Sequence, residues 1–361
     1  MDVSGGAYDA PMPHRNALGY ADLTPQQVLD ALDAVGLRGD GRILQLNSYE
    51  NRVFQVFLED GQAVVPKFYR PGRWSDAQIV EEHDFALELA AAEVPVVAPL
   101  LLRPSADAPP GLRLLPAGDA PTLACLDSAE ARYRYAVSPR QAGRAPELDN
   151  PETLLRLGSF IGRLHAVGAR RPFQHRRVLD PRRDGRWALA LLLDGGFVPD
   201  DQRAAWQGRC EAALDAVEAA FERFGELTLL RLHGDCHPGN VLWRDDVASS
   251  GAHVVDLDDA FMGPAVQDLW MLVSGEGEAA AQQRRLLLRG YRQFMRFDER
   301  ELMLIEPLRT LRMVRHSAWL AERWADPTFP LNFPFFGTSA YWSEQAVQLQ
   351  EQLEAMTNLN R

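Results

Sequence analysis

The spacing of apolar residues changes along this chain, and that change limits the folds it can adopt. Residues 42–69 contain three short segments that read as strands, RILQLN, RVFQVFLED and GQAVVPKFY, with Asp60-Gly61 as a hairpin signal between the last two. Residues 76–92 follow with good helix formers and apolar residues at helical spacing. This part of the chain therefore predicts a sheet with one main helix beside it.

Weaker signals extend this β-rich part in both directions. Thr24 before a Pro and an amphipathic run predicts a short helix that precedes the strands. Further strands are predicted at 94–102, 112–115 and 122–126. Residues 1–22 contain Gly, Pro and Ala, and we expect them to be loosely ordered.

The chain beyond residue 150 is mostly helical in pattern. Helical spacing recurs in the segments 151–168, 203–224, 279–297 and 301–324. Residues 229–262 differ, because short apolar runs alternate there with turn residues. A proline-containing segment separates the two patterns, and we place a boundary near 137–147.

The composition excludes several classes of function. The net charge of −12 disfavours general binding to nucleic acid or to an anionic membrane. Three scattered cysteines show no disulfide framework or zinc spacing, and no stretch approaches the roughly 20 apolar residues that span a bilayer. We expect a soluble, cytoplasmic protein without a secretory signal that binds no nucleic acid and no membrane. No dimer interface is visible, so we expect a monomer.

The strongest local signal is LRLHGDCHPGNVLWRDDVASSGAHVVDLDD. It supplies Asp235, then Asn240 five residues later, and Asp256 after the next predicted strand. Phosphoryl transfer needs a carboxylate that orients the acceptor hydroxyl and takes its proton, and oxygen ligands that hold Mg²⁺ against the phosphates of ATP. We predict Asp235 as the catalytic base and Asn240 and Asp256 as Mg²⁺ ligands, with Asp256 part of the catalytic set. Side chains that only satisfy turn hydrogen bonds are the alternative.

Neighbouring polar residues are given supporting roles. Asp258 and Asp259 either assist the metal or cap the next loop, and we favour the structural role. Asp268 is expected to hold the catalytic loop in shape. His233 is expected to pack under the loop and His237 to orient the aspartate or a phosphate, because two histidines without a third soft ligand do not make a zinc site.

Lys67 is the second signal, and it is the only lysine in the chain. A kinase needs a lysine on this strand to neutralise the α- and β-phosphates, and a glutamate from the following helix to hold it. We choose Glu82 as that partner, with Glu81 as the alternative. Strand alternation puts Lys67 on one face with Val65, which would lie against the adenine, whereas Pro66 points away. A lysine on an edge strand is the competing interpretation, and Pro66 favours it.

The residues alone do not decide the roles of two segments. LNSYENRVFQV, between the first two strands, contains no glycine, so backbone N–H groups and the hydroxyl of Ser48 would have to contact the phosphates. An ordinary polar hairpin loop is equally compatible. The basic stretch 169–187 could dock an acidic or phosphorylated partner, but we favour a solvated surface.

These residues together predict an α+β, two-lobed protein-kinase-like fold. Residues 23–137 would form a small β-rich N-lobe with one main helix, and residues 138–361 a larger, mostly helical C-lobe. The motifs HGDxHxxN and DLDD resemble those of the aminoglycoside phosphotransferase/choline kinase-like branch of the kinase superfamily. The strings KFYRPGRW, EEHDFALEL, VDLDDAFMGPAVQDLWML and RWADPTFPLNFP extend the likeness, over nearly the whole chain, to the stress response kinase A (YihE-type) family.

The resemblance implies a cytoplasmic Ser/Thr protein kinase that uses ATP and Mg²⁺, phosphorylates itself and acts under stress. Carried over by motif, Asp235 would accept the proton, Asn240 and Asp256 would bind Mg²⁺, and Ser48 would lie at the ATP site. The sequence departs from the family pattern at the Pro before Lys67 and in 103–147. A kinase for a small alcohol and a nucleotide-binding scaffold without activity are the competing readings, and the catalytic residues do not separate the first of these from a protein kinase.

Overall fold

A computed structural model describes residues 23–127, 132–245 and 251–358, and the expectation for residues 1–22 lies outside them. The described residues form two compact units. The N-terminal unit runs to Val80 and includes Pro99–Arg140, and the C-terminal unit comprises Glu81–Ala98 and the residues from Gln141 onward. The division falls inside helix α2 (Asp76–Ala91).

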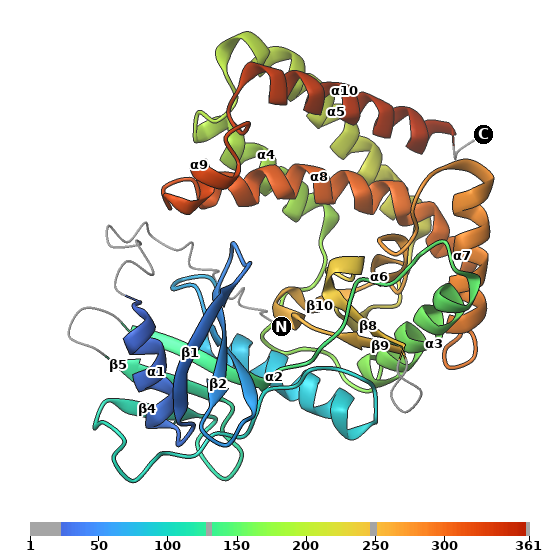
Figure 1. Cartoon of the computed structure of the whole chain (residues 1–361). Coiled ribbons are helices and arrows are strands. Elements are labelled where there is room, and N and C mark those ends of the chain that lie inside the picture. The colour runs from blue at the N-terminus through green and yellow to red at the C-terminus, as the bar shows by residue number, and fades with distance from the viewer. Residues whose placement is uncertain (1–22, 128–131, 246–250, 359–361) are drawn as a thin grey trace, which may run out of the picture. The chain divides into compact units, whose positions relative to one another are not determined.

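The N-terminal unit is built on a six-stranded antiparallel sheet of strand order β1-β2-β3-β6-β5-β4 (Figure 1). The strands are β1 (Gly39–Leu46), β2 (Arg52–Leu58), β3 (Ala63–Phe68), β4 (Leu112–Leu115), β5 (Leu123–Asp127) and β6 (Arg132–Pro139). Gly61, in the turn between β2 and β3, has φ 84°, as a tight hairpin turn requires.

Both faces of this sheet are covered. Helix α1 (Pro25–Ala34) begins with a capping box, in which the Thr24 hydroxyl accepts from Gln27 N. Its buried side chains Val28 and Leu32 pack with Phe68 and Tyr135 in one core. Ile79 of α2 belongs to a second, smaller core with Leu123, Cys125 and Ala136. Tyr135 donates its hydroxyl to the α1 carbonyl of Ala31 at 2.5 Å, which leaves its buried polar group satisfied.

Two predicted elements differ from the structure. Residues 94–102 form no strand of the sheet, although Val96 makes an isolated parallel bridge to Val254 and Leu100 N donates to the Val137 carbonyl of β6. Conversely, the predicted boundary segment 137–147 begins inside strand β6, which pairs with both β3 and β5. Its prolines suggested a linker, but Pro139 is the last residue of its strand, where a missing N–H is tolerated.

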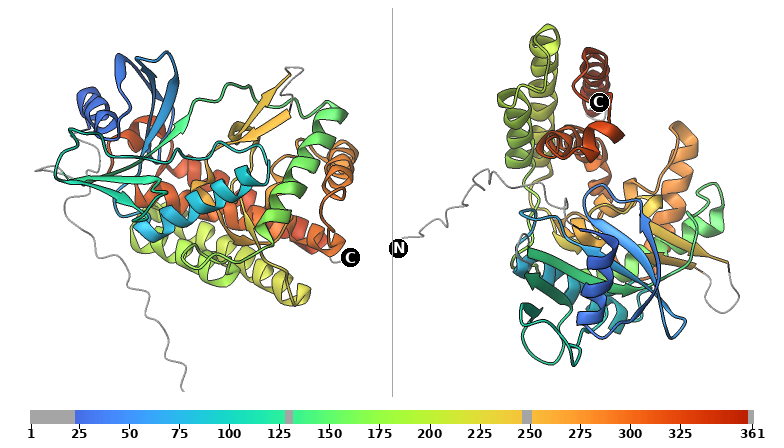
Figure 2. Two further views of the ribbon diagram at one scale, coloured as in Figure 1. Left: turned by 90° about the horizontal axis from the view of Figure 1, so that it is seen from below. Right: turned by 60° about the vertical axis from the view of Figure 1, so that its left-hand side comes forward.

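The C-terminal unit contains two layers of helices. Helix α3 (Pro151–Gly168) packs on α7 (Gly277–Tyr291), and Gly158 and Gly290 lie where the two backbones approach each other. Helices α4, α5, α8 and α10 make the second layer (Figures 1 and 2). Their bounds are Pro181–Asp194, Asp200–Phe224, Ile305–Glu322 and Ser339–Asn358. Trp206 of α5 meets Trp342 of α10 edge to face at 4.9 Å.

Short strands interrupt the helices over 230–263. Strand β7 (Leu230–Leu232) pairs with β10 (Phe261–Gly263), and β8 (Val241–Arg244) pairs with β9 (Gly251–Val254). The β8–β9 hairpin lies beside α3 (Figure 2). Further along the C-terminal unit lie three other short elements: α6 (Gln267–Trp270), the 3₁₀ segment η3 (Glu299–Leu304) and α9 (Thr328–Asn332). The fold is thus α+β, with an antiparallel sheet in one unit and a larger helical unit, as predicted.

None of the helices in the described part of the chain is both long enough and apolar enough to cross a membrane.

Candidate active site

The predicted catalytic loop leaves β7 at His233 and reaches β8 through the short 3₁₀ segment η1 (Pro238–Asn240). Asp268 of α6 holds its first turn, because the two carboxylate oxygens accept the backbone N–H groups of His233 and Gly234 at 2.8 Å each. Gly234 has φ 87°, and a Cβ there would overlap the carbonyl oxygen of Asp259 and the ring of Phe261. Only glycine fits this position.

Asp268 is itself completely buried and has a buried partner. Its Oδ2 lies 3.1 Å from His165 Nε2, and His165 Nδ1 lies 3.0 Å from the Tyr291 hydroxyl. Burial alone would raise the pKa of Asp268, but the hydrogen bond and charge of His165 outweigh it, so the pKa lies below its ordinary value. Asp268 therefore stays an acceptor for the loop, which is the supporting role predicted for it.

His233 connects the catalytic loop to the DLDD segment. Its Nδ1 accepts the N–H of Asp235 at 3.2 Å, so the proton is on Nε2, which donates to the Val255 carbonyl at 2.9 Å. The N–H of Val255 in turn donates to the Asn240 carbonyl at 3.1 Å. Both backbone groups of the residue before Asp256 are thus bound to the catalytic loop.

His237 is the residue on which Asp235 and Asp256 both act. His237 Nε2 lies 3.5 Å from Asp235 Oδ2, and the charges of both aspartates act on the imidazole. Burial lowers the pKa of His237, with Arg312 adding to the effect while the two carboxylates oppose it. Asp256 has a left-handed backbone, φ 61° and ψ 64°, which is rare for a residue with a side chain and is typical of functional sites.

Asn240 and Asp256 offer the hard oxygen donors that Mg²⁺ prefers. The amide nitrogen of Asn240 donates to the Asp235 carbonyl at 3.0 Å, which turns the amide oxygen away from that carbonyl. Across the residues that the structure describes, no three His, Cys, Asp or Glu side chains gather into a metal site of their own. This donor set suits a cation that takes its remaining ligands from phosphates and water.

Arg312 of α8 contacts Asp235 directly, and the sequence reasoning missed it. Its Nη1 pairs with Asp235 Oδ1, although 77 residues separate the two. His316, one turn further along α8, lies within the fields of both residues, and burial lowers its pKa. The helical pattern predicts that α8 has an apolar face, but it does not predict which loop the arginines of α8 contact.

Glu81 and Glu82 of α2 both bind the segment 174–176. Glu81 accepts the backbone N–H groups of Gln174, His175 and Arg176 at 2.5, 2.8 and 2.8 Å. Glu82 pairs with the guanidinium of Arg176 at 2.9 Å, and Arg176 also donates to the Asp258 carbonyl at 2.5 Å. Lys67 belongs to the other unit, so its pairing with Glu82 stays a prediction.

Lys67 lies inside the sheet, between Val53 of β2 and Ala136 of β6. Burial alternates along β3, so Lys67 shares the less buried face with Val65, while Pro66 points into the core. The β2–β3 ladder is interrupted opposite Pro66, which has no N–H to donate. The Lys67 ammonium lies 5.0 Å from the centre of the Tyr69 ring.

The loop around Ser48 is held by its own hydrogen bonds. The Ser48 hydroxyl accepts Asn51 N at 3.3 Å, and Asn51 Oδ1 accepts Arg70 N at 3.1 Å. The Arg70 guanidinium binds the carbonyls of Tyr49 and Glu50. A side-chain network thus shapes this loop where glycines are missing, and Arg70 in KFYRPGRW is a second residue that the sequence reasoning passed over.

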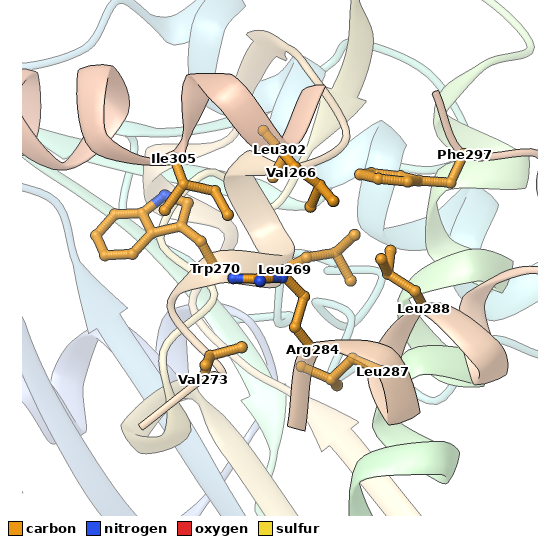
Figure 3. A pocket seen from close by; sticks show the side chains of 10 residues that line it. All are labelled: Val266, Leu269, Trp270, Val273, Arg284, Leu287, Leu288, Phe297, Leu302 and Ile305. Carbon is orange, nitrogen blue, oxygen red and sulfur yellow. The ribbon is translucent and has the colours of Figure 1, made fainter. Parts of the chain in front are cut away.

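A small apolar pocket lies among residues of α6, α7 and the start of α8 (Figure 3). Val266, Leu269 and Trp270 from and beside α6 face it, together with Leu287 and Leu288 of α7. None of the predicted site residues lines it. Its walls carry one charged side chain, Arg284, so this pocket does not suit a triphosphate.

Burial and ion pairing characterise two further features of the sequence. Burial raises the pKa of the Cys236 thiol well above its ordinary value, so it is not an activated nucleophile. Many residues of the basic stretch 169–187 are exposed, in line with the favoured solvated surface, while several of its arginines form ion pairs. The side chain of Arg176 is fully buried.

Comparison with known proteins identifies the family. Residues 42–305 match the model of the phosphotransferase enzyme family. The chain is 40% identical over 348 residues to a stress response kinase A of Salmonella choleraesuis, covering 94% of this chain and 96% of the relative. It matches the serine/threonine protein kinase RdoA of Salmonella typhimurium to the same extent.

A solved structure supports the fold. The amicoumacin kinase hAmiN, in complex with AMP-PNP, Ca²⁺ and Ami, superposes with a TM-score of 0.66 at 20% identity, covering 92% of this chain and 93% of that one. From its catalytic loop, its fold and these matches together, the chain belongs to the phosphotransferase enzyme family and, within it, to the stress response kinase A family of kinases.

Proposed function

We propose that this kinase is an ATP- and Mg²⁺-dependent serine/threonine protein kinase that also phosphorylates itself and acts in a bacterial stress response. The observation that carries the proposal is the hydrogen-bond network that links the backbone around the three predicted residues above one buried support. Asp235, Asn240 and Asp256 are fixed to each other through His233 and Val255, and Asp268 holds the loop from below.

Asp235 would act as the base. Its carboxylate is partly exposed, at 23%, while its backbone is held on both sides, so an acceptor hydroxyl can reach it. The hydroxyl oxygen attacks the γ-phosphorus as its proton passes to Asp235, and the bond between this phosphorus and the β–γ bridging oxygen breaks. The electron pair of that bond leaves with ADP.

The remaining residues would bind and orient the nucleotide. Asn240 and Asp256 would hold Mg²⁺, which neutralises charge on the β- and γ-phosphates when it is bound. Lys67, on the open face of β3 with Val65, would meet the α- and β-phosphates, and the Ser48 loop would cover them. Glu82 would hold Lys67 from α2 while it keeps its bond to Arg176.

Support for a protein acceptor comes from the relatives. The name of RdoA states a serine/threonine protein kinase, at 40% identity over 94% of this chain. Stress response is part of the name of the other relatives. A cytoplasmic location and a monomeric state belong to the same proposal and rest on the sequence reasoning above.

One assay tests the proposal. Labelled ATP with Mg²⁺ is offered to the protein alone, to a generic protein substrate and to a panel of small alcohols. We expect label on protein, and Asp235→Ala should lower the rate about 10²-fold or more while ATP still binds. Asp245→Ala is the matched control, because Asp245 follows the next strand and pairs with Arg144 at the surface.

Each result has a distinct meaning. Label found only on a small alcohol would identify a small molecule, not a protein, as the acceptor. ATP binding without any transfer would identify the chain as a nucleotide-binding scaffold. Full activity of Asp235→Ala would remove Asp235 as the base.

A further inference from the structure

Arg312 contacts the catalytic aspartate, and three further arginines gather around Asp184 close to it along α8. Arg177 precedes α4, Arg183 belongs to its first turn, and Arg315 lies on α8, one turn beyond the Arg312 that contacts Asp235. We call Arg177, Arg183 and Arg315 the arginine cluster. Its members come from parts of the chain more than 130 residues apart, as the Arg315–Asp184 pair shows, so the fold, not a local charge run, assembles it.

The cluster exposes its guanidiniums more than the carboxylate that they share. All three guanidiniums share one carboxylate, that of Asp184, at 3.1, 3.1 and 3.0 Å. The carboxylate is nearly buried, at 9% exposure, whereas the arginine side chains are 27%, 53% and 31% exposed. The charge of Asp259 also reaches Arg177, and Asp180 Oδ1 accepts the backbone N–H of Arg183 at 2.9 Å. These carboxylates offset the charge of the cluster in part, but the shared carboxylate of Asp184 lies beneath the more exposed guanidiniums.

Contacts connect the cluster to the catalytic loop by two routes. Arg177 lies 3.9 Å over the ring of Phe261, and that ring packs against Gly234, the residue before Asp235. On α8, Arg312 and Arg315 are three residues apart and hence neighbours on one helix face. The cluster therefore begins about one helical turn, roughly 5 Å, from the residue that contacts the catalytic base.

A cationic surface at this place selects acceptors by charge. The chain as a whole carries a net charge of −12, so acidic segments are repelled elsewhere. Exposed guanidiniums bind carboxylates and phosphates with paired N–H donors. An acceptor with an ammonium group next to its hydroxyl would meet like charge instead.

We propose that the arginine cluster is an acceptor subsite that recognises an anionic group within roughly three residues of the phosphorylated hydroxyl, a distance set by about 3.5 Å per extended residue. The inference rests on the proposed function and specifies its substrate class. An acidic side chain and a phosphorylated side chain share the chemistry that the cluster binds.

Matched serine peptides test the subsite. One carries aspartates after the serine, one a phosphoserine, one asparagines and one lysines, and each is measured for transfer and, with AMP-PNP present, for binding by fluorescence anisotropy. We expect kcat/KM at least tenfold higher for an anionic peptide than for the asparagine peptide, and lowest for the lysine peptide. The first two peptides distinguish a carboxylate from a phosphate as the preferred group.

Substitutions locate the preference. Arg315→Gln should reduce the anionic-to-neutral ratio about tenfold, and Arg315→Lys should retain part of it. Arg177 and Arg183 still pair with Asp184 in these variants, so its charge is not left unpaired. Arg183→Gln is a second variant, and it should affect folding less because the Arg183 side chain is more exposed. Arg309→Gln is the control on the same helix, because Arg309 pairs with Glu306 and lies over Trp270.

The outcomes separate the two proposals. Transfer to peptides without a preference for anionic neighbours, or a preference unchanged by Arg315→Gln, would overturn the subsite. Anionic peptides that bind through Arg315 but accept no phosphate would keep the subsite and overturn the protein kinase proposal.

Discussion

Arg312 is a positioning residue, because it acts on the acceptor through Asp235. Arg312 is exposed at 42% and Asp235 at 23%, so solvent screens the pair and its interaction is worth about 1 kcal/mol. The guanidinium holds the carboxylate in one orientation beside His237.

We therefore expect Arg312→Ala to lower kcat about tenfold while the KM for ATP stays within twofold. Arg312→Lys should recover part of the loss, since it restores the charge but not the fork geometry. Steady-state kinetics with ATP and acceptor varied separately provide the measurement. An increase in kcat would instead show that Arg312 blocks the base.

At this scale the sequence is informative where function is local. Asp235, Asn240 and Asp256 lie within one string of residues, and their spacing indicates their chemistry. Arg312 and His165 could not be predicted in this way, because they lie 77 residues from Asp235 and 103 residues from Asp268, and tertiary packing alone brings them there. Glu82 shows the same limit, since its partner Arg176 stands in a stretch that looked like solvated surface.

Among the elements, the contact between α3 and α7 depends on glycine at two positions. A Cβ on Gly290 would overlap the Leu155 carbonyl oxygen, and one on Gly158 would overlap that of Leu287. Backbone atoms cannot move aside as a flexible side chain can. This contact also positions His165 of α3 and Tyr291 of α7, which support Asp268.

Gly290→Ala should destabilise the fold by about 3 kcal/mol, the upper part of the range for overpacking. Urea unfolding followed by circular dichroism measures it. Gly208→Ala in α5 is the matched control: nothing lies within 4 Å of its Cβ position, so alanine should stabilise that helix by about 0.5–1 kcal/mol. Equal effects of the two substitutions would contradict the close approach.

Most elements could be predicted because their periodicity and end signals agree. The Thr24 cap, the Gly61 turn and α3 are examples. Residues 94–102 misled because an apolar run with prolines remains extended without joining a sheet. Helix α4 was not predicted, because its arginines suggested a basic surface stretch, although Asp180 and Pro181 form a standard helix start.

For the molecule as a whole, Glu301 makes stability depend on pH. It is buried at 4% exposure and accepts Val266 N–H at 2.9 Å, beside α6. Burial raises its pKa to about 7. Between its ordinary pKa of 4.5 and about 7, the folded protein keeps a proton that the unfolded chain has released, so stability falls as pH rises through this window.

This group should remove about 3 kcal/mol of stability between pH 4.5 and pH 7, at about 1.4 kcal/mol for each pKa unit. In Glu301→Gln the decline should be smaller by that amount. The free energy of unfolding in urea, measured across this pH range, provides the test. Glu278→Gln, a surface carboxylate paired with Arg285, should leave the slope as in the unsubstituted protein, and an unchanged slope in Glu301→Gln would refute the assignment.

The four hydrogen bonds that tie Glu81 and Glu82 to residues 174–176 have a consequence for control of the enzyme. In many protein kinases an outward swing of the helix that carries the lysine's partner serves as the off switch. Here that movement would strip two buried carboxylates of their donors at once. We therefore expect Glu81 and Glu82 to stay bound to residues 174–176 during the reaction cycle, and the output of the enzyme to follow the supply of nucleotide and acceptor.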